Sequence, residues 1–435
     1  MALVAAEHRD SVPVRPPDED NGGGLARDSE ASRPGVAVRL AAAAGRLAVL
    51  DWIGIGLLAA GAACVATGLL PTAQADATVR RILPLLLFLA TVIVLAELTA
   101  GAEVFDVIAS RVAIIARGHY PALFVLCTAF AAVTTISLNL DTTAVLLTPV
   151  MLALARKLKV AALPLAMTTV WLANTASLLL PVSNLTNLLA ANRVALRPAA
   201  FAGRMWAPQL ASIAATMAFL WAFYWRRGQR GAALYDPPSA HVPRDRLLFG
   251  VASAACVLFI AGILAGLPLG LASSISAGLV VIAFAARNRA ALRPALIPWR
   301  LLVFVTGLFL VVQTISRHGL GTLTGTLIGT SSGNSGAFRA AATGAGLSNL
   351  LNNLPSYVAG EAVVPVANHN QLLALLTGTD VGPIITPWAS LATLLWYERC
   401  RATGIVIPVK KFVLTGAGLA VAGLTAAIFA LLLAG

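Results

Sequence analysis

The chain has 435 residues, of which 58% are hydrophobic and only 11% are charged, and its formal net charge is +13. Soluble domains are about half apolar and about a quarter charged, so this composition excludes an ordinary soluble domain and indicates a membrane protein. The basic residues lie in short loops beside apolar runs rather than on one helix face, which excludes nucleic acid as a partner and fits membrane topology instead.

Residues 1–46 are polar and rich in Pro, Gly and Asp, which predicts a disordered cytoplasmic tail. The four cysteines form no C-x-x-C pair, and the histidines form no H-E-x-x-H motif. No nucleophile–base pair or metal cluster is apparent, so the sequence predicts neither an enzyme nor a bound cofactor or metal.

Apolar runs of about 20 residues, the length that crosses a bilayer, follow the tail. The uninterrupted runs are 47–70, 82–100, 205–225, 247–266, 268–286, 299–316 and 410–434. Two further runs, 164–192 and 370–397, are interrupted by Pro, Gly and polar residues. Two more, 119–155 and 335–366, are too long for one crossing and polar at mid-length, so we predict that each is a re-entrant hairpin. The Gly-, Ser- and Thr-rich stretch 319–336 predicts a flexible external connector.

Counting the interrupted runs as spans gives nine crossings, with a cytoplasmic N-terminus and an extracytoplasmic C-terminus in the inner membrane. In this arrangement 18 of the 31 Lys and Arg residues lie inside, 7 lie outside and the other six lie in the tail. This bias agrees with the positive-inside rule, although Arg80 and Arg81, assigned to an outer loop, oppose it.

The order span, span, hairpin, broken span, span occurs twice, at 47–225 and at 268–434. Residues 226–267 form a linker and an extra span, so the two copies have opposite orientations. The sequence therefore predicts an all-α integral membrane fold built as an inverted repeat with two re-entrant hairpins and two broken helices. That plan is typical of secondary transporters.

The four polar interruptions carry the candidate solute site. Pro and Gly end helices and leave backbone groups unpaired, while Ser, Thr and Asn can cap the resulting half-helices. These residues could also merely cap kinks and pack helices. Interruptions at matching places in two halves nevertheless favour a transport site. The candidate substrate-binding residues are Asn139, Thr142, Thr143, Ser177, Ser183, Asn184, Asn187, Ser348, Asn349, Asn352, Asn353, Thr386 and Ser390.

Two acidic residues lie within these interruptions, where a carboxylate is costly and usually functional. Asp141 is at the first hairpin tip and Asp380 at the second broken span. We predict that they bind the coupling proton or cation, Asp141 first and Asp380 second. Asp51, Glu97 and Glu361 lie nearer the predicted span ends, where solvation accounts for them.

The interrupted segments resemble the ion transporter superfamily, and within it the arsenite-efflux (ArsB-like) branch. The matching stretches are Asn139-Leu-Asp-Thr-Thr-Ala-Val-Leu-Leu-Thr-Pro149, Thr175-Ala-Ser-Leu-Leu-Leu-Pro-Val-Ser-Asn-Leu-Thr-Asn187, Ser348-Asn-Leu-Leu-Asn-Asn-Leu-Pro355 and 378–396, which is the most specific. The resemblance implies an elevator-type fold and efflux of arsenite or antimonite, in exchange for protons. More distant relatives carry dicarboxylates, citrate or sodium, and relatives with this architecture are often dimers. Two departures are Leu140, which separates an Asn and an Asp that are often adjacent in that branch, and Asn174, where an acid is often found.

The leading hypothesis is a proton- or potential-coupled exporter of arsenite-like oxyacids. The alternatives are a sodium- or proton-coupled anion symporter of the citrate or dicarboxylate kind and a Na⁺/H⁺ antiporter. A channel would instead show a continuous polar pore. The chain lacks a phosphate-binding loop, so ATP-driven pumping would require a separate ATPase subunit.

Overall fold

The structure is a computed structural model that describes residues 49–226, 234–329, 331 and 333–434. The predicted tail lies outside these residues. Within them the chain is helical and has no β-strand, which confirms the all-α prediction. Seven helical stretches of the described residues are long and apolar enough to cross a membrane. The two interrupted runs are absent from these seven because each is divided into helices that are individually too short.

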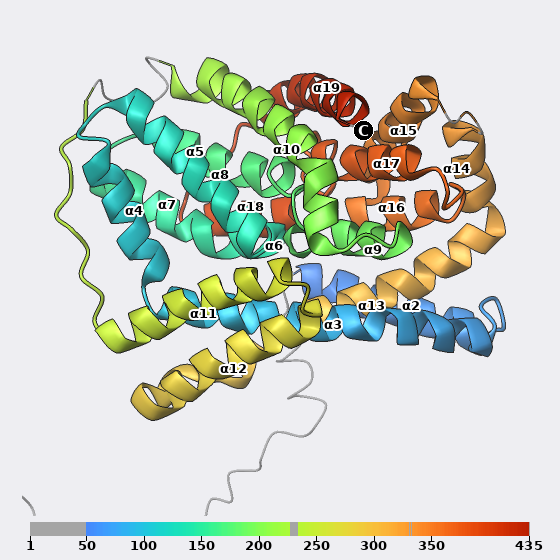
Figure 1. The fold of residues 1–435 in the computed structure, drawn as a ribbon, viewed down its shortest axis with the longest axis horizontal. Helices are drawn as coiled ribbons and strands as arrows, with labels where there is room; N and C mark the ends of the chain where they lie inside the picture. The colour runs from blue at the N-terminus through green and yellow to red at the C-terminus, as the bar shows by residue number, and fades with distance from the viewer. Residues whose placement is uncertain (1–48, 227–233, 330, 332, 435) are drawn as a thin grey trace, which may run out of the picture. The chain divides into compact units, whose positions relative to one another are not determined.

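Five helices pack on one another and form what we call layer A (Figure 1). They are α2 (Val49–Ala66), α3 (Thr72–Gly101), α11 (Arg246–Leu264), α12 (Leu269–Arg287) and α13 (Trp299–Ile315). Helices α2 and α13 approach closely, because a Cβ added to Gly307 would lie 2.3 Å from the backbone nitrogen of Leu58. Small residues that let backbones meet in this way are typical of membrane helix pairs.

The remaining long helices form layer B, which makes few contacts with layer A. Its first half contains α5 (Tyr120–Ser137), α6 (Leu140–Thr142), η1 (Thr143–Leu147), α7 (Thr148–Lys157), α8 (Ala162–Thr175), η2 (Pro181–Ser183), α9 (Leu185–Arg193), α10 (Pro198–Leu220) and η3 (Trp221–Trp225). Its second half contains α15 (Asn334–Leu351), α16 (Asn353–Glu361), α17 (His369–Val381), α18 (Leu391–Ala402) and α19 (Val409–Leu433). The halves meet through α10 and α19 and through α8, α17 and α18 (Figure 1).

Two helical connections lead from layer A to layer B. The first is α4 (Val104–Ile115), which follows α3. The second is η6 (Ser316–Leu320) with α14 (Gly321–Ile328), which follow α13. The prediction of a flexible connector at 319–336 is therefore wrong for α14. Arg339 of α15 donates hydrogen bonds to the carbonyls of Thr326 and Leu327, in the last turn of α14. Basic side chains stabilise helix C-termini in this way, so a contact distant in sequence supports a helix that local composition disfavours.

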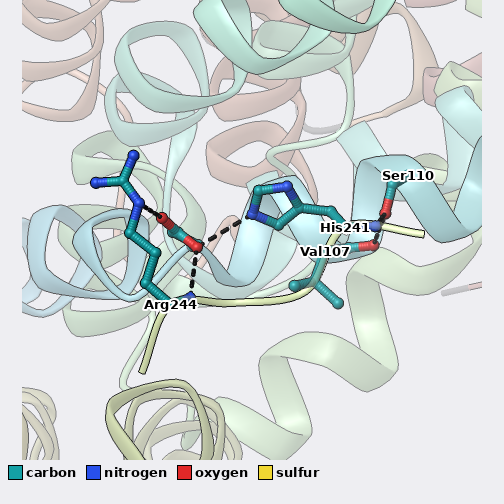
Figure 2. A network of polar contacts seen from close by, with 5 residues as sticks. Val107, Ser110, His241 and Arg244 are labelled. Atoms are coloured by element: carbon teal, nitrogen blue, oxygen red, sulfur yellow. Dashed lines mark hydrogen bonds and ion pairs between the residues drawn. The ribbon is translucent and has the colours of Figure 1, made fainter. Parts of the chain in front are cut away.

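The third connection is an extended strap, residues 234–245, that leads to α11. Glu103, at the junction of α3 and α4, holds it. Figure 2 shows His241 and Arg244 of the strap and Ser110 of α4 in this network. The Glu103 carboxylate accepts a hydrogen bond from the backbone N–H of Arg244 at 3.0 Å, contacts the His241 ring nitrogen at 3.1 Å and pairs with the Arg244 guanidinium at 3.3 Å. The backbone N–H of His241 donates to the Ser110 hydroxyl at 3.1 Å. The strap is thus fastened to the start of α4 by charge-assisted hydrogen bonds.

These contacts predict an acid-sensitive contribution to stability. Burial alone would raise the pKa of Glu103, but the N–H of Arg244 and the charges of His241 and Arg244 lower it below its usual value. Because the pKa of Glu103 is lower in the folded state than in the unfolded state, its ionised form stabilises the fold. This contribution is fully present above the unfolded-state pKa of about 4.3 and is lost as the pH falls through the folded-state pKa. Because the contact between Glu103 and Arg244 lies near the surface, we expect it to contribute on the order of 0.5 kcal/mol to the free energy of unfolding. Thermal unfolding at a series of pH values should show a flatter acid limb for Glu103→Gln than for the wild type, whereas identical limbs would contradict this role.

Helix α3 begins ten residues before the predicted run at 82–100, because its first turns carry Gln, Asp and Arg that lower the local hydropathy. Arg80 and Arg81 therefore lie inside α3, and their assignment to a loop is wrong. Arg80 forms an exposed i,i+4 pair with Asp76. Arg81 instead pairs with Glu361 of α16, in layer B.

Candidate substrate site

The two hairpin tips have the same strained backbone. Asn139, between α5 and α6, has φ 144°, and Asn352, between α15 and α16, has φ 115°. Residues other than Gly rarely adopt such angles, and this strain is typical of functional sites. Each Asn caps the following helix: the Asn139 side chain accepts from the N–H of Thr142 at 2.8 Å, and the Asn352 side chain accepts from the N–H of Leu354 at 3.4 Å. The two tips therefore have the same local construction.

The two broken helices also correspond. Helix α8 ends at Thr175 and α9 begins after Asn184, while α17 ends at Val381 and α18 begins after Ser390. Each break is thus nine residues long, 176–184 and 382–390, and each ends in a polar N-cap. Asn184 accepts from the N–H of Thr186, and Ser390 accepts from the N–H of Thr393 at 3.1 Å. Ser and Asn are preferred at N-caps because their side chains satisfy an otherwise unpaired backbone donor.

Hydrogen bonds join each break to the hairpin of its own half. In the first half, the Ser183 hydroxyl donates to the carbonyl of Ile136 at 2.9 Å. In the second half, the backbone N–H of Asn353 donates to the carbonyl of Ala389 at 2.8 Å. The side chain of Asn349 also donates to the carbonyl of Gly382 at 2.9 Å. Breaking the helices therefore does not leave these backbone groups unpaired.

Further hydrogen bonds join the two halves. Thr186 of α9 donates to the Asp380 carboxylate of α17 at 2.6 Å, and Asn174 of α8 donates to the Thr393 hydroxyl of α18 at 3.3 Å. The Trp396 indole N–H donates to the carbonyl of Ala166 at 2.9 Å. The four interruptions consequently form one connected cluster.

A small pocket lies where four helices begin. Its lining includes Leu140, Leu185 and Leu391, the first residues of α6, α9 and α18, and Asn353, the first residue of α16. Helix N-termini carry partial positive charge and unpaired N–H groups, which attract oxygen atoms. The polar side chains of the lining are Asp141, Asn184, Asn352 and Asn353; Leu301, Phe304 and Val305 of α13 close it from layer A. Its volume of about 20 Å³ is close to that of a single water site.

A larger cavity of about 430 Å³ reaches the same carboxylate. Asp141 and Thr142 lie in its lining, as does Leu301, which it shares with the small pocket. Its charged residues are Glu97, Asp141, Arg300, Glu398 and Arg399, so three acidic and two basic groups line it. Asp141 itself is 6% exposed, and its carboxyl group forms no hydrogen bond or ion pair with another described residue. The larger cavity therefore brings open space up to the side chain of Asp141.

The predicted site residues separate into two groups. Asp141, Asn184, Asn352 and Asn353 line the small pocket, and Thr142 lines the larger cavity. The others line neither cavity and form hydrogen bonds within the protein; they are Asn139, Thr143, Ser177, Ser183, Asn187, Ser348, Asn349, Thr386, Ser390 and Asp380. The hydrogen bonds of the latter group hold the backbone of the breaks and the tips in place.

The sequence does not predict that α13 of layer A lines both cavities, because this helix has an uninterrupted apolar sequence. The prediction for Glu361 is also wrong. Solvation at a span end does not account for this residue, since its side chain is only 3% exposed and is paired with Arg81. The sequence feature that could indicate a buried, paired Glu361 is its partner Arg81, but no sequence pattern relates residues 280 positions apart.

A polytopic helical chain whose broken helices and strained tips surround a small pocket with one carboxylate and three carboxamides has the features of a secondary transporter. The profile of the citrate transporter family, CitMHS, matches residues 46–393. The chain therefore belongs to this family of membrane transporters, and it is a multi-pass membrane protein.

Individual relatives agree. The chain is 31% identical to an arsenical pump membrane protein of Escherichia coli over 308 residues and 32% identical to that of Yersinia enterocolitica over 313 residues, covering 66% of this chain and 71% of each relative. The fold is similar to that of the YdaH transporter of Alcanivorax borkumensis, with a TM-score of 0.53, 13% identity and coverage of 88% of this chain and 96% of YdaH. The resemblance to arsenite-efflux permeases and citrate-transporter-like permeases is thus confirmed.

Proposed function

We propose that this chain exports arsenite or antimonite across the inner membrane. The observation that carries the proposal is the small pocket, where four helices begin around three carboxamides and one carboxylate. Arsenite near neutral pH is an uncharged acid with three hydroxyl groups. Carboxamides both donate and accept hydrogen bonds, and helix N-termini attract the ligand's oxygens, so the chemical groups around the pocket suit such a solute. The names of the bacterial relatives point to the same class of solute.

The family description favours citrate as an alternative solute. A tricarboxylate needs cationic partners, because burying uncompensated charge is costly. Among the described residues, no Arg, Lys or His lies in the lining of the small pocket. This absence of cationic partners supports a neutral oxyacid over a citrate- or dicarboxylate-like anion.

Coupling is assigned to Asp141, with a proton as the coupling ion. Its carboxyl group lies between the small pocket and the larger cavity and has no partner among the described residues. A buried carboxyl group in this position can hold a proton in one conformation and release it in another. The second predicted coupling residue, Asp380, accepts a hydrogen bond from Thr186, which supports a role in positioning α9. Sodium coupling and a Na⁺/H⁺ antiporter remain the alternatives.

The proposed mechanism is a movement of layer B, with its re-entrant hairpins, against layer A. Few contacts join the layers, and the order of elements repeats in the two halves, as expected for an inverted repeat at 47–225 and 268–434. The positive-inside rule assigns Arg300 and Arg399 to the cytoplasmic side, so the larger cavity would open to the cytoplasm in this conformation. The cytoplasmic N-terminus and extracytoplasmic C-terminus stay predictions, as do a homodimer and an accessory ATPase subunit.

Export predicts a phenotype that can be measured directly. Expressed in bacteria that lack their own arsenic pump, the chain should raise arsenite tolerance and lower the arsenic retained by the cells. The vector alone and the chain carrying Asp141→Asn serve as controls. Unchanged tolerance and retention, with the protein present in the membrane, would remove the arsenite proposal, and citrate uptake in the same cells would favour the alternative.

A further inference from the structure

A second acidic site lies away from the substrate pocket, where the two layers touch. Glu361 is the last residue of α16, in layer B, and its Oε1 pairs with a guanidinium nitrogen of Arg81, on α3 in layer A. About half of the Arg81 side chain is exposed, at 51%, whereas that of Glu361 is 3% exposed. The ion pair therefore joins a buried carboxylate of one layer to a partly solvated cation of the other.

The surroundings of Glu361 leave polar atoms without partners among the described residues. Its own Oε2 is buried and unbonded, as are Nε of Arg193 and the Tyr357 hydroxyl. Arg193, at the end of α9, donates to the backbone carbonyl of Glu361 at 3.3 Å. Among the described residues, Arg81 and Arg193 are the charged groups that act on the carboxylate. The Tyr357 hydroxyl, one turn earlier on α16, is near enough to interact electrostatically with both Glu361 and Asp380 of α17.

This geometry makes the layer contact depend on charge. If layer B slides along layer A while Glu361 is ionised, Arg81 is withdrawn and a buried carboxylate loses a partner, which is strongly unfavourable. A protonated Glu361 has no such requirement, because a neutral carboxyl group tolerates burial. The unpartnered Oε2 is an available position for that proton.

We propose that Glu361 is a second proton-binding site of the transporter and that its ion pair with Arg81 is a latch between the layers, closed when Glu361 is ionised and released when it is protonated. The proposal rests on the proton-coupled sliding of the layers proposed above. It assigns Asp141 to the solute pocket and Glu361 to control of the movement, so the two acids have separable effects.

The test measures the movement without a solute, so its outcome does not depend on arsenite. Spin labels are placed on exposed positions of the two layers, Leu83→Cys on α3 and Leu350→Cys on α15, which are 61% and 74% exposed. The four native cysteines are first replaced by alanine in the full chain, which is reconstituted in lipid nanodiscs. Double electron–electron resonance then gives the distribution of distances at about pH 8 and about pH 6, a range over which a buried carboxyl group can titrate.

We expect the wild-type distribution to shift on acidification, with the second population growing at least about fivefold relative to the first. Glu361→Gln should show the acidic distribution already at about pH 8 and lose the pH response. Arg81→Gln, which changes a partly exposed residue, should do the same if Glu361→Gln proves unstable. Arg80→Gln is the matched control, since Arg80 is the neighbouring cation and pairs within its own helix; it should behave as the wild type.

A wild-type distribution that does not respond to pH would overturn the latch. So would a response that survives in Glu361→Gln or in Arg81→Gln. An inactive Asp141→Asn protein with an intact pH-dependent distribution would leave the latch in place. Conversely, a variant that has lost the pH response but keeps normal arsenite tolerance would leave the exporter proposal in place.

Discussion

Asp141→Asn is expected to abolish coupled arsenite export, lowering the initial rate in proteoliposomes with an imposed proton gradient by at least about 100-fold. Asn keeps the shape of the side chain but cannot take up or release the proton. The carboxyl group of Asp141 lies at the meeting point of both cavities and has no other described partner, so no neighbour can replace it. Arsenic released from preloaded vesicles, measured at a series of pH values, gives the rate.

Asp106→Asn is the matched control for this variant, because it makes the same chemical change on α4, in a residue that lines neither cavity. It should transport at the wild-type rate. If Asp141→Asn kept both the wild-type rate and its dependence on the proton gradient, Asp141 would not be the coupling residue.

Gly378→Ala is expected to destabilise the second half of layer B. A Cβ at this position of α17 would lie 2.1 Å from the backbone carbonyl oxygen of Ala341 on α15, and a backbone atom cannot move aside cheaply. The helices must separate, at a cost of about 1–3 kcal/mol. Since α15 carries the Asn352 tip and α17 leads into the second break, the variant should also weaken solute binding.

Gly346→Ala provides the comparison on the same helix pair. It lies on α15, where an added Cβ meets nothing within 4 Å, and replacing Gly by Ala within a helix is favourable by up to about 1 kcal/mol. Thermal unfolding of the purified proteins in detergent should place Gly378→Ala below the wild type and Gly346→Ala at or above it. Equal midpoints for the two variants would show that the backbones of α15 and α17 do not approach each other at Gly378.

The sequence predicts the membrane helices well because a bilayer requires long apolar runs, and α2, α11, α12, α13 and α19 begin and end close to the predicted bounds. Helix α10 begins seven residues before its predicted run. The sequence also predicts where the helices break within the membrane, because Pro and Gly end helices and Asn caps the helices that follow. It fails at the start of α3 and at α14, where helices are rich in polar residues or glycine. Contacts such as Arg339 with the end of α14 stabilise the latter, and they join residues that no local pattern relates.

For the candidate site, the sequence predicts the segments that the structure brings together, but it does not predict which of their side chains line the two cavities. Of the predicted residues, Asp141 and Asn184 face a cavity, whereas Asn139 and Ser390 satisfy the backbone at the same interruptions. A residue's type does not show whether its side chain turns toward a solute or toward the next helix turn. The importance of Glu361 is hidden in the sequence for the same reason, because its burial depends on how α16 packs against α3 and α9.

The central claim is that four helix N-termini and Asp141 form one pocket that binds a small oxyacid. The most direct measurement is a crystal structure of the full chain soaked with arsenite, with diffraction data collected at the arsenic absorption edge. We predict a single strong anomalous peak bounded by Leu140, Leu185, Asn353 and Leu391. A peak elsewhere in the chain, or helices that run unbroken through residues 176–184 and 382–390, would contradict the claim.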